Sequence, residues 1–281
     1  MKAFAALLFG ALLAGQSPGA DVVRDRLNAY LLAYEPQLSE LIADEQMEQH
    51  DVPEREGRPG ADTFAKRTLR SEVAFIALPG GAGWLGFRRV ITVGGKAVEE
   101  SASSLGEVLP AGPHSDYAKA RTMLADSARF NLGAPRTTNL PNLPLELLHP
   151  RHAHRFTVRI AGKERVSGKH TTKLVFVESV TPTIIQAVDG GEMRSIVTAW
   201  VETVNGRLWR ADVTTRDTRE HAAAFDAVVS VDFREHQALG LLVPTAMREK
   251  FFSDFERRAW GNASYANYRR FQTSGRIVPQ F

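Results

Sequence analysis

The 281-residue sequence predicts an α+β protein in which a large antiparallel β-sheet packs on two or three helices. Three observations predict it. From residue 155 onward the chain is a series of short β-rich segments, several of them alternating apolar and polar residues. Asn205-Gly206 joins two of these segments, and this dipeptide is typical of a type I′ hairpin turn. The regular alternation of strand and helix that marks parallel sheets is absent, which argues against Rossmann and TIM-barrel architectures.

Helix signals are confined to three places. Residues 21–34 carry apolar side chains at steps of three and four, which places them on one helical face. Asp21 is a suitable N-cap, and Pro36 is expected to end this helix. A second helix is expected at 115–130 and a short one within 139–149.

Strands are expected on both sides of this helical region. Pro244 lies inside one of them, so that position should be at a sheet edge or a bulge. The expected strands are 41–49, 68–78, 84–93, segments beginning near 156 and 174, 195–204, 207–213, 227–233, 241–252 and 263–271.

Charge and cysteine content exclude several classes of protein. The net charge is only +3, with the basic residues scattered, which does not indicate a nucleic-acid surface. The chain has no cysteine, so it has neither disulfides nor a catalytic thiol. The core must therefore hold the fold by itself.

The N-terminus resembles an export signal. Lys2 precedes an apolar stretch, residues 3–14, and small residues follow up to Ala20. We expect residues 1–20 to be a removable signal peptide and residues 21–281 to form one β-rich domain with a helical insertion near 115–149. The mature protein is expected to be periplasmic or secreted, not membrane-spanning, and not a lipoprotein, because no cysteine follows the signal.

Two patterns could indicate a cofactor or a metal. Residues 81–86 spell G-x-G-x-x-G, but a strand follows instead of the helix whose N-terminus would bind a dinucleotide, so a hairpin loop is favoured. His149, His152 and His154 are close in sequence, and the last two would share a face on a strand. Arginines flank them and no acidic residue lies between or directly beside them, so solvated histidines are favoured over a metal site.

No pattern of a nucleophilic or metal-dependent hydrolase is present. We therefore expect no enzyme activity and no cofactor. Large apolar residues on predicted strands are the remaining candidates for function, because a concave apolar face can bind a ligand with little polar chemistry. These speculative ligand-binding residues are Trp84, Phe156, Phe176, Trp200 and Trp209.

The order of elements resembles the curved half-barrel of the LolA, LolB and RseB type of periplasmic protein. The segments that carry this resemblance are 196–202, 205–213, 229–233, 241–244 and 265–271. The resemblance implies a curved sheet that wraps around helices and leaves an apolar cavity. It assigns no functional residue.

A second resemblance is to uncharacterised exported proteins of soil bacteria, especially Acidobacteria. It implies no activity. The segments that carry it are 69–72, Pro79, Trp84, 87–88, 127–133, 239–244, 247–249 and 265–271.

From these observations we expect an exported, non-enzymatic protein that carries or senses a lipid, a lipoprotein or another apolar ligand in a concave sheet. Two alternatives remain open. One is an envelope module that binds another protein through an exposed strand edge. The other is a hydrolase or metal-dependent enzyme that uses the region of His149, His152 and His154.

Overall fold

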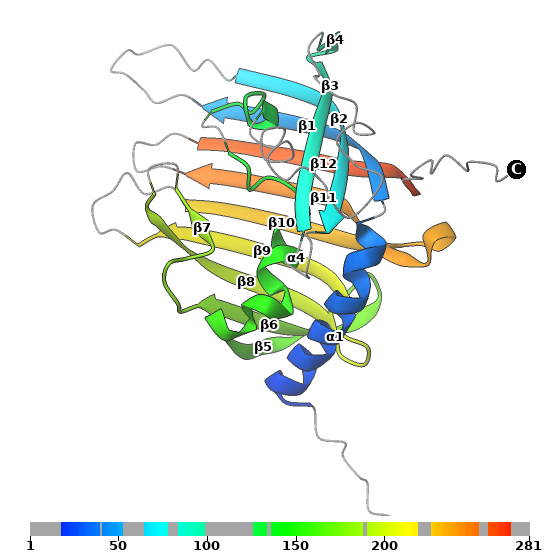
Figure 1. The fold of residues 1–281 in the computed structure, drawn as a ribbon, viewed down its shortest axis with the longest axis vertical. Helices are drawn as coiled ribbons and strands as arrows, with labels where there is room; N and C mark the ends of the chain where they lie inside the picture. The colour runs from blue at the N-terminus through cyan, green and yellow to red at the C-terminus, as the bar shows by residue number, and fades with distance from the viewer. Residues whose placement is uncertain are drawn as a thin grey trace, which may run out of the picture.

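The described chain forms one open antiparallel sheet (Figure 1). The computed structural model describes residues 18–39, 41–52, 65–77, 84–98, 126–133, 136–187, 190–218, 226–252 and 258–270. Eleven strands take the order β4-β3-β2-β1-β12-β11-β10-β9-β8-β6-β5, and the twelfth, β7, pairs with β8 off this path. The predicted large antiparallel sheet is thereby confirmed.

Most strands are ten to thirteen residues long, and β4 and β7 are two-residue pairings. Their bounds are β1 Leu41–Val52, β2 Ala65–Ala77, β3 Trp84–Val93, β4 Lys96–Ala97, β5 Phe156–Val166, β6 Lys169–Glu178, β7 Ile185–Gln186, β8 Glu192–Glu202, β9 Leu208–Asp217, β10 Asp226–His236, β11 Leu241–Phe252 and β12 Arg258–Arg270.

Several expectations fall outside the described residues. They concern the signal peptide up to residue 17, the glycine-rich loop 81–83, and the expected helix 115–130 up to residue 125. Of that helix, only a short helical turn at 126–128 is described.

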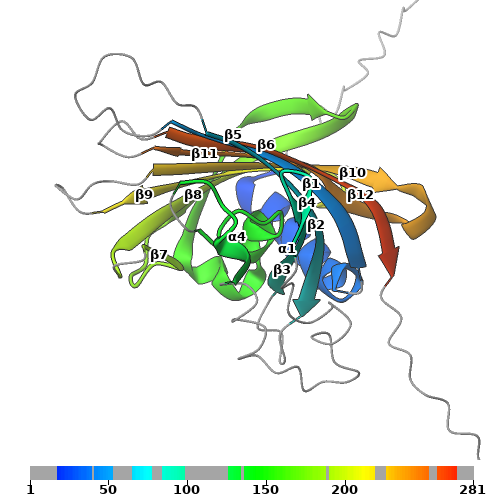
Figure 2. The same ribbon diagram turned by 90° about the horizontal axis from the view of Figure 1, so that it is seen from above.

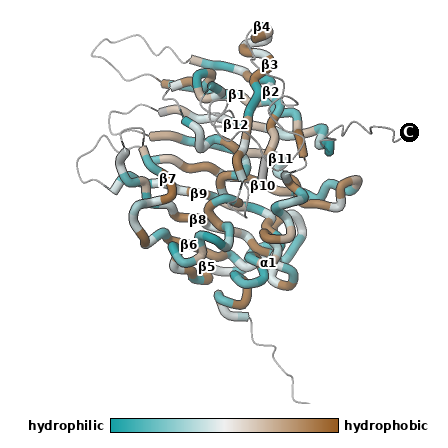
Figure 3. The backbone as a smooth tube through the Cα atoms, viewed as in Figure 1, coloured by the Kyte–Doolittle hydropathy of each residue, from teal (hydrophilic) through white to brown (hydrophobic). Residues whose placement is uncertain are grey.

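The sheet arches over two α-helices, α1 (Ala20–Leu38) and α4 (Leu143–Leu148) (Figure 2). Two 3₁₀ helices, η2 (Pro150–Arg155) and η3 (Gln237–Leu239), are also described. One continuous buried apolar cluster joins α1 and α4 to nine of the strands on the concave side, and Figure 3 shows hydrophobic stretches along the middle strands of the sheet. None of the described helices is both long and apolar enough to cross a membrane.

Helix α1 begins and ends elsewhere than the sequence predicts. Its apolar face is as predicted, since Val23, Leu27 and Leu31 are fully buried. Gly19 occupies the N-cap position in place of Asp21, and the helix continues through Pro36 to Leu38. Proline removes only one backbone donor, and so close to the helix end its ring does not stop the last turn from closing.

Helix α1 bridges the two margins of the curved sheet. It contacts β2 near one margin and both β5 and β6 at the other. Trp84 at the start of β3 also donates its indole N–H to the Glu35 carbonyl of α1 at 3.3 Å. The open side of the arch is therefore closed by a helix and not by strand pairing.

Pro244 lies beside a bulge, as the sequence predicts. The register of β10 and β11 shifts between Asp232 and Phe233, where Phe233 pairs with Pro244 and Thr245 is the extra residue. The freed Pro244 carbonyl accepts a hydrogen bond from the Tyr268 hydroxyl at 2.5 Å.

The β8–β9 hairpin is confirmed, but its turn is not type I′. Of Asn205 and Gly206 only the glycine has a positive φ, 75°. The loop is longer because Glu202 and Arg207 close it, with the Glu202 N–H donating to the Arg207 carbonyl at 2.8 Å. It rests on α1, where Arg26 donates to the Thr203 carbonyl at 2.5 Å.

Replacing Gly206 with alanine should destabilise the protein strongly. A Cβ at this position would lie 2.2 Å from the Arg26 carbonyl oxygen, which is backbone and cannot rotate away. Gly168 is a matched control, because its φ is 78° and an added Cβ would meet nothing within 4 Å. We expect G168A to cost about 1 kcal/mol for its backbone conformation, and G206A to cost about 1–3 kcal/mol more. Urea unfolding measures both, and equal costs would contradict the contact with α1.

Candidate functional site in the concave face

Three of the predicted ligand-binding aromatics are part of the buried core on the concave side of the sheet. Trp84, Phe176 and Trp209 belong to the buried apolar cluster, and Phe156 at the start of β5 is half-buried against its border. The indole N–H of Trp209 donates to Glu202 at 3.0 Å. Whether these residues bind a ligand stays a prediction.

Trp200 lies on the opposite face of the sheet. Its neighbours Ala199 and Val201 belong to the concave cluster, and side chains alternate along a strand. Lys173 and Arg210 cover its ring at 4.9 and 4.7 Å from the centroid. The structure therefore does not bring Trp200 together with the other four residues.

Trp84 is part of a contact between the margin of the sheet and the end of α1. Its ring meets the His149 ring edge-on at 5.5 Å between centroids. The Arg151 backbone N–H donates to Nδ1 of His149, which places the proton on Nε2, and Nε2 donates to the Glu35 carboxylate at 3.0 Å. His149 is thus a buried structural residue that joins α1 to η2.

The other two histidines are positioned separately. His152 and His154 lie in η2 and not on a strand, so the strand geometry that would place them on one face is absent. His152 approaches Glu146 at 3.4 Å and accepts from Arg151 at 2.9 Å, while His154 is exposed. Within the described ranges, no three histidine or acidic side chains are grouped so that they could hold a metal ion.

A buried ion pair occupies the concave face near β1 and β3. Arg88 donates from Nε and Nη2 to the two oxygens of Glu45, at 2.6 and 2.8 Å. Both side chains are essentially inaccessible to water, with 1% and 0% of their surface exposed. Arg88 also donates to the Asn139 carbonyl at 2.7 Å. A charge buried to this degree is tolerated only when paired and fully hydrogen-bonded.

Amides extend this ion pair into a network. Asn131 accepts from both Asn139 and Gln49, each at 2.8 Å. Its own side-chain N–H donates to the Arg136 carbonyl at 2.9 Å. A second buried pair follows, in which Arg136 donates to Glu249 on β11 at 2.5 Å.

The network fastens residues 131–133 and 136–139 to the inner face of β1, β3 and β11. It also perturbs its surroundings: burial, followed by the Glu45 charge, raises the pKa of Tyr265 well above its ordinary value. Composition does not reveal this network. Its only sequence signal is a charged residue, Arg88, in the alternating row of Trp84 and Val90 on an otherwise apolar strand face.

Four of the buried carboxylates that this structure describes serve as acceptors. Glu178 accepts from the backbone N–H groups of Ile184 and Ser195 at 2.9 and 3.2 Å. Glu35, Glu45 and Glu249 accept from His149, Arg88 and Arg136. Carboxylates hydrogen-bonded in this way meet the requirement that buried charges be paired.

Removing Arg88 should be costly because Glu45 would be left buried without a cation. We expect R88M to lose about 3–5 kcal/mol of unfolding free energy, and the double variant E45L/R88M to recover most of it. K66M is the control, because the Lys66–Glu48 pair is largely exposed and should leave the urea midpoint nearly unchanged. An R88M variant as stable as K66M would contradict this assignment.

His152 should make the protein less stable in mild acid. Burial, followed by the charges of Arg151 and Arg155, lowers the pKa of His152 from 6.5 to about 4. In the unfolded chain His152 therefore binds a proton below pH 6.5, whereas in the folded chain it binds one only below about pH 4. The free energy of unfolding is therefore unaffected by His152 above pH 6.5 and decreases as the pH falls toward 4. We expect a decrease of about 1–2 kcal/mol, less than a fully buried ring would give, because this ring is partly exposed.

The check is urea unfolding at several pH values for the wild type and H152Q. The variant should lose less stability than the wild type between pH 7 and pH 4, and identical slopes would refute the effect of burial.

Comparison with known proteins identifies no family for the chain. No family model matches the sequence, and no curated protein matches it. The acidobacterial-type resemblance therefore stays a prediction.

Several solved structures share parts of the arrangement at very low identity. A domain from Vibrio parahaemolyticus, provisionally assigned to outer-membrane lipoprotein sorting, is 12% identical, with 91% of this chain and 93% of that chain covered and a TM-score of 0.42. A DUF1329 family protein from Desulfovibrio piger is 12% identical, covering 90% and 93%, with a TM-score of 0.38. A LolA superfamily protein from Nitrosomonas europaea is 10% identical, covering 94% and 99%, with a TM-score of 0.33. Likeness at this level assigns the chain neither a family nor a function.

Proposed function

We propose that the chain is an exported, non-enzymatic binding protein that holds an apolar ligand, such as a lipid or the acyl chain of a lipoprotein, against the concave face of its sheet. The observation that carries the proposal is the closure of the arch by α1, which contacts β2 near one margin and β5 and β6 at the other.

This closure can open at low cost to the sheet. Separating two paired strands breaks a ladder of backbone hydrogen bonds, whereas α1 is held mainly by side chains. Its directed contacts include the Tyr34 hydroxyl donating to the Leu242 carbonyl at 2.6 Å and the Trp84 indole donating to Glu35. Movement of α1 would leave every strand pair intact and expose an apolar surface.

In the structure α1 and α4 fill the concave face, so the ligand must replace part of their contacts. The strand residues of the buried cluster are suited to this, since Val197, Ala199 and Leu208 present only hydrocarbon. An acyl chain that buries the same surface gains about 25 cal/mol per Å². Phe156 and Val158 on β5 are half-buried at the border of the cluster and provide an entry next to α1.

The non-enzymatic part of the proposal is supported by the buried carboxylates, which the fold uses as acceptors. The exported part is supported by the sequence of residues 1–20. We therefore assign the protein to the periplasm or to the secreted fraction.

Native mass spectrometry of protein purified from a bacterial periplasm, followed by organic extraction, tests the proposal. We expect a stoichiometric lipid or uptake of one when lipids are added. A clean apo mass with no uptake would overturn it.

Tryptophan fluorescence locates the ligand. The chain has four tryptophans, so variants that keep one and carry phenylalanine at the other three are practical. Lipids with brominated acyl chains should quench the Trp84-only and Trp209-only variants. The Trp200-only variant is the matched control on the opposite face and should be quenched little. Equal quenching in all three would show non-specific association.

Binding of another envelope protein is a second candidate, favoured by β5. This strand is the end of the sheet order, and no described strand pairs with its outer edge. Arg159, Lys163 and Arg165 are exposed along it, which suits an acidic extended segment added as a further strand. In that case the purified protein would carry no lipid, and the partner would protect β5 amides from hydrogen exchange.

A further inference from the structure

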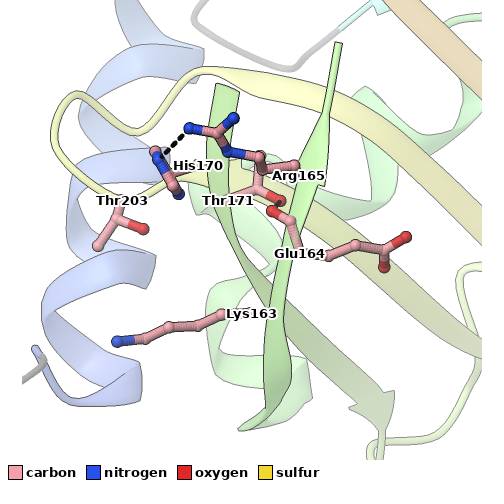
Figure 4. A pocket seen from close by; sticks show the side chains of 6 residues that line it. All are labelled: Lys163, Glu164, Arg165, His170, Thr171 and Thr203. Atoms are coloured by element: carbon pink, nitrogen blue, oxygen red, sulfur yellow. Dashed lines mark hydrogen bonds between the residues drawn. The ribbon is translucent and has the colours of Figure 1, made fainter. Parts of the chain in front are cut away.

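A pocket lined by polar and charged residues lies at the end of the β5–β6 hairpin, beside the loop that joins β8 and β9. Its volume is about 320 Å³, near the lower end for small-molecule sites. Three of its six side chains are basic or can become so. It is lined by Lys163, Glu164, Arg165, His170, Thr171 and Thr203 (Figure 4).

The acidic and basic side chains of the pocket point in different directions. Figure 4 shows Lys163, Arg165 and His170 on one side of the hairpin and the Glu164 side chain extending to the other. The Glu164 carboxylate accepts from the Trp200 indole N–H at 2.7 Å, which fixes it near the convex face. Glu164 is therefore held away from the cations.

Arg165 keeps its charge while its position is fixed. Its Nη2 lies 2.8 Å from Nε2 of His170. Because a guanidinium can only donate, His170 accepts through Nε2 and carries its proton on Nδ1. No carboxylate of the described residues lies within ion-pair distance of Arg165, so the remaining N–H groups of the guanidinium face the pocket without an acidic competitor.

The walls of the pocket are held by three separate elements. The Thr171 hydroxyl donates to the Glu164 carbonyl at 2.7 Å, across the β5–β6 hairpin. The Thr203 hydroxyl lies 2.9 Å from that of Thr172, which ties the β8–β9 loop to β6. Arg26 of α1 donates to the Thr203 carbonyl at 2.5 Å. A basic pocket with fixed walls is pre-organised for an anion.

We propose that this pocket binds one phosphate group, either free or as the headgroup of a phospholipid. The Arg165 guanidinium provides a fork of N–H donors that matches a phosphate, and Lys163 adds a second positive charge. The Thr203 hydroxyl can donate to a further oxygen. The pocket lies on the outer end of a hairpin, so this site goes beyond the proposed function and does not require an apolar ligand.

The test is titration of the full isotope-labelled protein with inorganic phosphate, followed by NMR. Phosphate should shift the resonances of His170 and the residues around it in a saturable manner. The variant K163Q/R165Q should bind phosphate at least tenfold more weakly. K96Q is the matched control, because Lys96 is exposed on β4 near the other margin of the sheet, and it should bind as the wild type does. Thermal melting confirms that the variants are folded.

A second arm separates the two sources of phosphate. A short-chain phosphatidylglycerol below its micelle concentration is compared with glycerol phosphate. Binding of the lipid at least tenfold more tightly identifies a phospholipid headgroup, and equal binding identifies free phosphate. The proposal is overturned if phosphate produces no saturable shift, or if K163Q/R165Q and K96Q bind it equally. Quenching of Trp84 and Trp209 reports on the concave face separately, so failure of one site is distinguishable from failure of the other.

Discussion

In a curved antiparallel sheet that does not close on itself, one apolar face and two margins must be covered by other elements. The rest of this structure depends on the element that covers them. Helix α1 covers the face with Val23, Leu27 and Leu31 and reaches both margins. Side-chain contacts, and not ladders of backbone hydrogen bonds, hold α1 against the sheet. The helix can therefore move away while the strands stay paired. Opening the concave face would require only this separation, whereas opening a fully paired barrel would have to break strands.

The concave face is divided into an apolar and a polar part. Under α1 and α4 the strands present hydrocarbon, whereas near β1, β3 and β11 they present Glu45, Arg88 and Glu249. The buried ion pair also selects the strand register. A one-residue slip of β1 would turn Glu45 to the outer face and leave Arg88 buried without its partner. The buried ion pairs therefore specify the strand register more strictly than apolar packing alone would.

Local patterns predicted most of the elements, and non-local contacts account for the differences. The alternation of apolar and polar residues predicted the strands, and the helical spacing of apolar residues predicted the buried face of α1. The persistence of α1 beyond Pro36 and the longer turn at Gly206 depend on contacts between α1 and the sheet. The face of Trp200 could be read only once its strand was placed relative to the core. Arg88 and Glu45 are 43 residues apart, so their pairing follows from the order of strands, which no motif encodes.

The position of β12 has a consequence for how the chain acquires its structure. The last strand lies in the middle of the sheet, between β1 and β11, and Arg269 on it bonds Asp44 across 225 residues of sequence. Contacts this distant make folding slow, because a long loop must close before the pairing stabilises it. A chain that emerges N-terminus first cannot complete its central strands until β12, Arg258–Arg270, has emerged. Until then β1 exposes an unpaired edge, the situation in which holding chaperones prevent aggregation.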